Sequence, residues 1–159
     1  MNDVFADLVN VHLDEFHHQL RNFARRLTKE HITPFAEQWE EDNLFDRALY
    51  TKAADAGLLA PHFPETYGGG GGDVFHSMVC TEEMMRGGST GTVIGLGSLN
   101  IAIPPLLSLG TSEQKETWLP SIHNGTAIAA LGITEPGTGS DVAGVTTKAV
   151  RDGTGYRIS

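Results

Sequence analysis

The sequence predicts an α+β fold in which an all-α N-terminal domain is followed by the first strands of a β-domain. Apolar residues recur at helical spacing up to about residue 120, and beyond Thr126 they change to the alternation typical of strands. A chain of 159 residues has the size of one domain plus a piece of another. We therefore expect a helical domain over residues 1–125 and an incomplete β-domain over residues 126–159.

The first predicted helix carries an apolar stripe. Its members recur at alternating spacings of three and four, which places them on one helix face: Leu13, Phe16, Leu20, Phe23 and Leu27. Pro34 lacks an N–H and disfavours helical geometry at the preceding residue, so the helix should kink or split there. Phe35 and Trp39 then continue an apolar face.

Basic and imidazole side chains of this first helix are expected on its solvated face. The basic ones are Arg21, Arg25 and Arg26. The histidines are His12, His17 and His18, and the adjacent pair should point apart. We therefore predict neither a nucleic-acid patch nor a metal site here.

Two further helices flank a run of five glycines. Asp46 can cap a helix over residues 47–56, which Gly57 should end. The glycine run Gly68–Gly72 is either a flexible linker or a tight loop in which backbones approach one another. Apolar and helical patterns flank it closely, which favours the tight loop. Asp73 can then cap a helix over residues 74–86.

The apolar, glycine-rich segment 87–110 is interpreted as a helix packed on several sides. Each glycine lowers helix propensity by ~1 kcal/mol relative to alanine, which indicates close packing or space left for a ligand. Packing is the preferred interpretation for Gly95 and Gly97. Pro104 and Pro105 should distort this helix or mark its restart.

A short helix and three strands should complete the chain. Thr111 and Gln114 have capping-box spacing and open a helix that Pro120 should stop. Residues 126–133 are predicted to form a buried strand. Residues 145–151 and 156–159 should pair as a hairpin through the glycine-containing turn 152–155.

Composition excludes several classes of function. Eleven basic and twenty acidic residues give a net charge of −9, which argues against nucleic-acid binding. No apolar run approaches the ~20 residues needed to span a bilayer, so we expect no integral membrane segment. The lone Cys80 excludes an internal disulfide and fits a reducing, cytoplasmic compartment. Its neighbours place it on a buried helix face.

The segment from Thr134 to Asp141 has the residues of a ligand-binding loop. Gly137 and Gly139 can adopt backbone angles closed to other residues and turn N–H groups toward an anion. Thr134 and Ser140 add hydroxyls that donate and accept. From the residues alone, a phosphate-bearing ligand and a plain polar loop both remain open. Glu135 and Asp141 are better explained as loop shapers, which accept from backbone N–H groups, than as an acid–base pair.

The segment "ITEPGTGSDVAGVTTKAVRDGTGYRIS" strongly resembles the acyl-CoA dehydrogenase family, in which an apolar strand runs into T-E-P-G-x-G-S-D. "PHFPETYGGGGGD" is similar to the family's P-E-x-Y-G-G-x-G loop. "LLSLGTSEQKETWLPSIHNGT" is similar to its G-T-x-E-Q-K…W-L-P segment. The resemblance covers most of residues 10–159, with the motifs in the family's order.

This resemblance implies a fragment of a longer enzyme that binds flavin adenine dinucleotide (FAD). Its reaction would be α,β-dehydrogenation of a fatty acyl-CoA to the trans-2-enoyl-CoA, with electrons passed to an electron-transfer flavoprotein. A middle β-domain and a C-terminal four-helix domain would complete a homotetramer or dimer. The family's catalytic glutamate would follow Ser159, so no catalytic residue is assigned. We expect the chain to be inactive alone and to bind FAD weakly or not at all.

The resemblance also implies site residues. FAD would be contacted by Leu131, Ile133, Thr134, Gly139 and Ser140, with the Thr134 side chain on the pyrimidine edge and Leu131 acting through its backbone. The acyl-CoA would lie near Ser140, Val93, Ile94 and Gly97. Two other classes remain as alternatives. One is a related acyl-CoA oxidase or flavin monooxygenase, and the other is a non-catalytic helical binding module.

Overall fold

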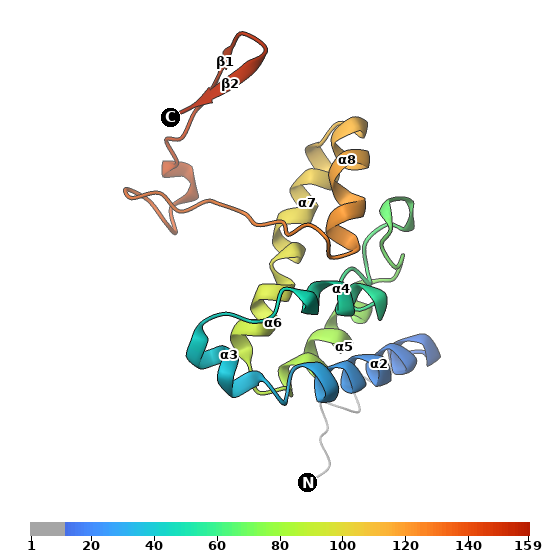
Figure 1. The fold of residues 1–159 in the computed structure, drawn as a ribbon. Coiled ribbons are helices and arrows are strands. Elements are labelled where there is room, and N and C mark those ends of the chain that lie inside the picture. Colours follow the sequence, from blue (N-terminus) through green and yellow to red (C-terminus); the bar gives the residue numbers. More distant parts are fainter. Residues whose placement is uncertain (1–11) are drawn as a thin grey trace.

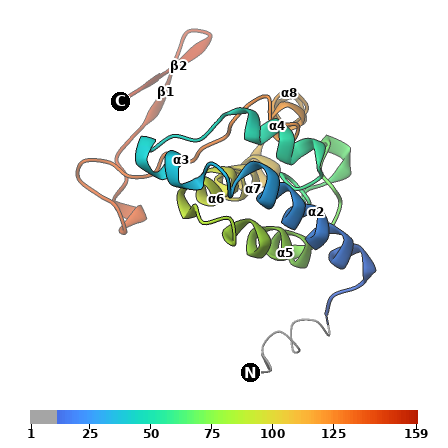
Figure 2. The same cartoon turned by 60° about the horizontal axis from the view of Figure 1, so that its bottom comes forward.

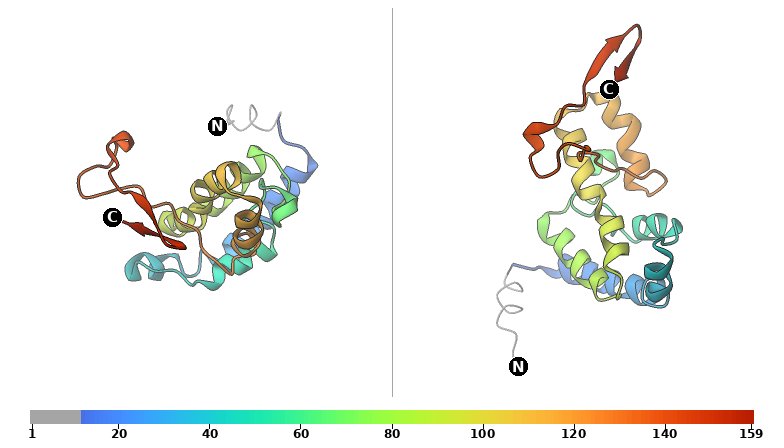
Figure 3. Two further views of the ribbon diagram at one scale, coloured as in Figure 1. Left: turned by 90° about the horizontal axis from the view of Figure 1, so that it is seen from above. Right: turned by 90° about the vertical axis from the view of Figure 1, so that its left-hand side faces the viewer.

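The computed structural model describes residues 12–159, so the first eleven residues of the predicted helical domain lie outside the described part. Helices pack into one body, and an antiparallel hairpin stands apart from it (Figures 1 and 3). The helices are α2 (Glu15–His31), α3 (Ala36–Asp42), α4 (Ala48–Asp55), α5 (Val74–Met85), α6 (Thr90–Gly97), α7 (Leu99–Leu109) and α8 (Ser112–His123). The strands are β1 (Ala149–Asp152) and β2 (Gly155–Ile158). The predicted α+β fold is confirmed.

The core lies where α4, α7 and α8 meet. Leu49, Leu99, Ile103 and Leu119 are at most 1% exposed and belong to a single cluster of buried side chains. Burying a leucine or isoleucine contributes about 2 kcal/mol by area, so these four side chains are a main source of the domain's stability.

The helices α2 and α5 lie side by side and begin at the same end (Figure 2). The predicted stripe is wrong at two positions, because Phe16 is 71% and Phe23 44% exposed. The buried face of α2 carries Ala24, Leu27 and His17 instead. The helical period was correct, but α5 covers a face rotated away from the phenylalanines.

Arginines that were assigned to a solvated face bind α5. Arg25 donates from Nε and Nη2 to the Glu83 carboxylate over 3.0 and 2.9 Å, and Arg21 donates to Glu82 over 2.9 Å. The Glu83 side chain is only 2% exposed. Its hydrogen bonds from Arg25 lower the pKa of Glu83 and keep it ionised. The interpretation of Arg21 and Arg25 as merely solvated is therefore wrong.

Two of the three predicted caps are confirmed, while the N-cap of α4 is Arg47 rather than Asp46. Asp73 accepts from the N–H groups of Phe75 and His76, and Thr111 forms the expected capping box with Gln114. Pro34 also splits the first helix as predicted, since α2 ends before it and α3 begins after it.

Prolines farther along do not stop their helices. Pro120 lies inside α8, and Pro104 with Pro105 lies inside α7, so the expected stop at Pro120 is wrong. A proline in a helix removes one hydrogen bond, and burial of the following turn offsets that cost. In α8 this turn carries Ile122 and His123, which are both buried. The helical path restarts at Ser98 rather than at the prolines.

The glycine run forms a tight loop, as predicted. Gly70 N–H donates to Ala60 O over 2.9 Å, and Gly71 N–H donates to Phe63 O over 2.8 Å. A Cβ placed at Gly69 would lie 2.3 Å from Phe63 O. Only glycine permits this approach of two backbones.

The predicted strand over residues 126–133 is wrong, while the hairpin is confirmed. Within the described chain, residues 126–133 pair with no neighbouring strand, and a strand requires such a partner for its backbone groups. In the hairpin, Asp152 pairs with Gly155, and Gly153 takes a positive φ of 61° in the turn.

One described helical stretch is long and apolar enough to cross a membrane. It runs over Thr90–Leu109, 20 residues with a mean hydropathy of 1.6, so the expectation that no apolar run approaches this length is wrong. Leu96, Leu99 and Ile103 within it are buried against other helices. A core helix passes the same test of length and composition, which makes this weak evidence for a membrane span.

Candidate functional site

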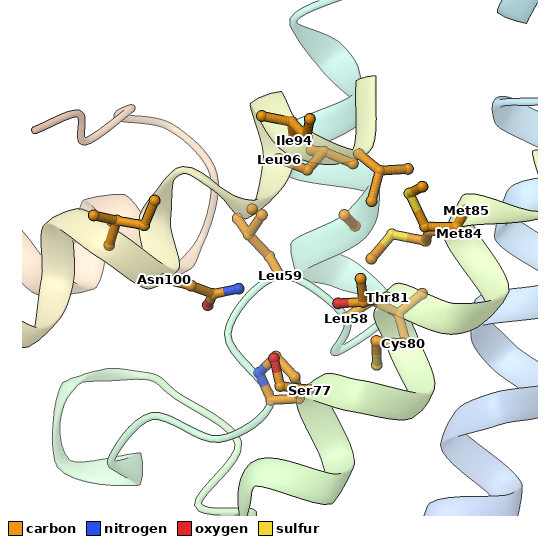
Figure 4. A pocket seen from close by; sticks show the side chains of 15 residues that line it. Leu58, Leu59, Ser77, Cys80, Thr81, Met84, Met85, Ile94, Leu96 and Asn100 are labelled. Atoms are coloured by element: carbon orange, nitrogen blue, oxygen red, sulfur yellow. The ribbon is translucent and has the colours of Figure 1, made fainter. Parts of the chain in front are cut away.

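A cavity of about 260 Å³ lies between α5 and the α6–α7 path, with the segment Leu58–Pro61 forming another wall (Figure 4). Its lining is mostly apolar: Ala53, Leu58, Leu59, Pro61, Ser77, Cys80, Thr81, Met84, Met85, Val93, Ile94, Leu96, Gly97, Asn100 and Ile101. An apolar pocket with few polar groups is the usual form of a site for a small organic ligand.

The α5 wall follows directly from helical spacing. Ser77, Cys80, Thr81 and Met84 are separated by three, one and three positions, so they share one face that turns toward α6. This spacing was the signal that could have added them to the predicted site. Two methionines in the lining, Met84 and Met85, can adapt to ligands of different shape.

Cys80 is a wall of the cavity rather than a reactive group. It is 1% exposed, and burial raises the pKa of its thiol to about 12. The buried helix face predicted for Cys80 is confirmed. Ser77, Thr81 and Asn100 supply polar groups at the lining (Figure 4).

Two glycines of α6 behave differently. A Cβ at Gly95 would lie 2.5 Å from the Phe45 ring, and Gly95 O accepts from Tyr50 Oη over 3.0 Å. Gly95 therefore serves close packing. A Cβ at Gly97 would meet nothing nearer than 4.0 Å, at Asn100 Nδ2, and Gly97 lines the cavity with Val93. The preferred interpretation of close packing is therefore confirmed at Gly95 and wrong at Gly97, where the missing side chain leaves open volume at the cavity lining.

The segment with the predicted FAD contacts begins close to the α6–α7 junction. Ser98 Oγ, at the α6–α7 junction, donates its one proton to Gly95 O over 2.8 Å and lies 3.4 Å from Ala129 O, two residues before Leu131. The five predicted FAD contacts are all exposed: Leu131, Ile133, Thr134, Gly139 and Ser140. No hydrogen bond within the described chain occupies the side-chain hydroxyls of Thr134 and Ser140.

Glu135 shapes the loop, as predicted. Its carboxylate accepts from the N–H groups of Thr146 and Thr147 over 2.9 and 2.8 Å, and from Thr146 Oγ1 over 2.9 Å. Asp141 contributes through its backbone oxygen, which accepts from Thr138 Oγ1 over 2.6 Å. The carboxylate of Glu135 thus ties the start of the loop to the chain eleven residues later.

The glycines of the loop do not adopt the predicted special angles. Neither Gly137 nor Gly139 has a positive φ, and a Cβ at either position would meet nothing within 4 Å. They leave open surface against which a flat ligand can lie, but within the described loop they form no turn that requires glycine.

Protonation of Glu135 should release the loop only in strong acid. Hydrogen bonds from Thr147 and Thr146 lower the pKa of Glu135 from 4.5 to about 2. The folded pKa is depressed, so the stabilisation is present above about pH 4.5 and is lost as the pH falls through about 2. The carboxyl ¹³C chemical shift of Glu135 should therefore titrate near pH 2. Titration of the Glu135 carboxyl near pH 4.5 would contradict these contacts. Glu135→Gln should accelerate amide hydrogen exchange at Thr146 and Thr147, whose N–H groups donate to the carboxylate.

The family model described as "Acyl-CoA dehydrogenase, N-terminal domain" matches residues 14–126. "Probable acyl-CoA dehydrogenase YngJ" of Bacillus subtilis is 35% identical over 152 residues, covering 95% of this chain and 40% of that protein. The rat "Long-chain specific acyl-CoA dehydrogenase, mitochondrial" is 37% identical, covering 90% and 33%. A Bacillus anthracis acyl-CoA dehydrogenase solved in complex with FAD superimposes with a TM-score of 0.83 at 32% identity, covering 92% and 25%. The chain spans at most two fifths of the two curated relatives' length.

Proposed function

Because this chain belongs to the acyl-CoA dehydrogenase family, we propose that it forms the helical part of an FAD-dependent enzyme that oxidises a fatty acyl-CoA thioester. The proposed reaction is α,β-dehydrogenation to the trans-2-enoyl-CoA. Its helical domain, over residues 1–125, would bind the acyl chain, and residues 126–159 would begin the domain that binds the flavin.

The observation that carries this proposal is the position of the α6–α7 junction, which lines the cavity and lies beside the chain that leads to the loop. Gly97 lines the apolar cavity, and Oγ of the next residue, Ser98, lies 3.4 Å from Ala129 O in the chain that enters the loop at Leu131. The acyl chain of a thioester would be buried among Val93, Leu96 and Met84, at ~0.8 kcal/mol per methylene. Its reacting end would then lie toward the loop.

The loop fits a flavin in its donor groups and its openness. Thr134 and Ser140 offer free hydroxyls, Leu131 and Ile133 offer exposed apolar surface, and Gly139 leaves room for close approach. When bound, the flavin would supply the hydride acceptor. These five residues would hold and orient it, and Ser140 would also contact the acyl-CoA.

The remaining roles are proposed for the whole protein. No catalytic base is assigned among the described residues. Electrons would pass to an electron-transfer flavoprotein, the chain would assemble as a homo-oligomer, and the protein would be cytoplasmic and without an integral membrane segment. The net charge of −9 disfavours nucleic acid as a further partner.

The test uses the full-length protein that contains this chain. We expect it to bind FAD and to convert a series of saturated acyl-CoA thioesters to enoyl-CoA with an electron-transfer flavoprotein as acceptor. Turnover with oxygen alone would identify an oxidase instead. Absence of both flavin and thioester oxidation would overturn the proposal.

Gly97→Val should shift the preference toward shorter acyl chains, because it places three carbons in the open side of the cavity. A mismatch of one methylene in an apolar pocket is worth about 10- to 200-fold in kcat/KM. We expect a loss of at least about tenfold for long chains and little change for short ones. Thr90→Val, an exposed change on α6 that does not line the cavity, is the control. An equal loss at all chain lengths would contradict the placement of the acyl chain.

A further inference from the structure

Two histidines and an aspartate converge where α2 and α5 begin. One ligating atom from each of His17, Asp73 and His76 lies within 4.8 Å of the others. His17 Nε2 is 3.1 Å from Asp73 Oδ1, and His76 Nδ1 is 2.8 Å from the same oxygen. His17 is 3% exposed, so its assignment to the solvated face of the first helix is wrong.

One of the two neutral tautomers of His17 presents a nitrogen lone pair to the cluster. Its Nδ1 lies 2.7 Å from Asp14 Oδ1, and its Nε2 faces Asp73 Oδ1. A neutral imidazole carries one N–H and cannot donate to both carboxylates. Nδ1 also accepts from the Asp14 backbone N–H over 3.1 Å, as the second bond of a capping box. With the proton on Nδ1, bonded to the Asp14 carboxylate, that backbone bond is given up and the Nε2 lone pair points at the cluster. A carboxylate that orients a histidine in this way is the usual outer partner of a metal-ligating histidine.

We propose that His17 Nε2, Asp73 Oδ1 and His76 Nδ1 form a binding site for a divalent transition-metal ion, and that Zn²⁺ is the preferred ion. Imidazole nitrogens with one carboxylate suit zinc. Ligand atoms about 2.1 Å from a tetrahedral zinc ion are about 3.4 Å apart, so the two spacings to Asp73 Oδ1, 3.1 and 2.8 Å, must widen on binding. The two histidine nitrogens lie within 4.8 Å of each other, and a movement of the half-buried His76 adjusts all three spacings.

The positive ends of two helices meet at this place and would repel a cation, so its binding depends on the carboxylates nearby. The carboxylates of Asp14 and Asp73 offset the positive ends of α2 and α5. Asp73 is exposed, so solvent can supply the remaining ligand. His76 Nδ1 also accepts from Asp73 N–H over 3.1 Å, and water replaces that bond at the exposed cap when zinc takes the nitrogen. The bound ion fastens the first turn of α2 to that of α5.

The test is calorimetric titration of the chelator-treated protein with Zn²⁺ alone, near neutral pH. Asp73→Asn and His76→Gln each remove a ligand but keep a good N-cap or capping-box residue, so α5 should still form. We expect the unsubstituted protein to bind one ion per chain. Each of these two variants should bind zinc more weakly by more than the roughly 10- to 100-fold that loss of an outer partner costs. Asp14→Asn should weaken binding by about tenfold. Circular dichroism checks that each variant is folded.

His18→Gln is the matched control, because His18 is the exposed neighbour of His17 and lies outside the cluster. It should leave the affinity unchanged. Zinc should raise the melting temperature of the unsubstituted protein but not that of Asp73→Asn. The proposal is overturned if the unsubstituted protein takes up no zinc. It is also overturned if Asp73→Asn and His76→Gln bind zinc as tightly as the unsubstituted protein, or if His18→Gln is the variant that loses it.

Discussion

Gly125→Ala is expected to lower the free energy of unfolding by about 4 kcal/mol, the sum of backbone strain and overpacking. Gly125 follows the end of α8 with φ +76°, a conformation that costs alanine about 1–2 kcal/mol. A Cβ there would lie 2.5 Å from both C and O of Tyr50 in α4. These are backbone atoms, so α8 and α4 must separate.

Gly57→Ala provides the matched control for this prediction. Gly57 has a similar φ of +72°, but a Cβ there would meet nothing within 4 Å. Its cost should be the strain alone, about 1–2 kcal/mol. Urea unfolding, with the slope m checked for each variant, measures both. Equal losses at the two positions would show that the contact between Gly125 and α4 is absent in solution.

Glu83→Gln should destabilise the protein by about 2 kcal/mol, because it removes a charged acceptor from a paired guanidinium. Arg25 donates two hydrogen bonds to this buried carboxylate, and Arg86 Nε lies 3.8 Å from Glu83 Oε1. Arg25 itself is 60% exposed and can be rehydrated, which keeps the loss below that of a stranded buried charge.

The neighbouring Glu82 is also paired with arginines but is more exposed than Glu83, so it serves as a control for the effect of burial. Its side chain is 44% exposed and pairs with Arg21 over 2.9 Å and with Arg86 over 3.4 Å. Exposed ion pairs contribute about 0–1 kcal/mol, so Glu82→Gln should have a small effect. A double-mutant cycle of Glu83→Gln with Arg25→Ala should give a coupling energy of at least about 1 kcal/mol. Independent effects would mean that α2 and α5 are not held by this pair.

Local features of the fold were predictable from the sequence. The caps at Asp73 and Thr111 were correct, because each joins a side chain to an N–H two or three residues away. The break at Pro34 and the turn at Gly153 were correct for the same reason. The stop at Pro120 was wrong, because the buried turn after it supports the helix more than the missing hydrogen bond weakens it.

The candidate site was predicted only in part. Val93, Ile94 and Gly97 came from the family resemblance, and they line the cavity. The opposite wall on α5, including Met84, was not identified; its helical spacing was a signal for a shared buried face, but only the structure shows that this face lines the cavity. The roles of Thr134 and Ser140 stay predictions, supported by their exposure and free hydroxyls.

It was possible to predict from the sequence alone where α5 and α8 begin, which segment makes the hairpin and which family the motifs resemble. These features depend on contacts within a few residues or on motif order. Packing between distant segments explains why Phe16 is exposed while His17 is buried, and why Gly95 packs against Phe45 while Gly97 opens into a cavity. Helical spacing places residues on a common face, but which face is buried depends on segments that arrive from distant parts of the chain.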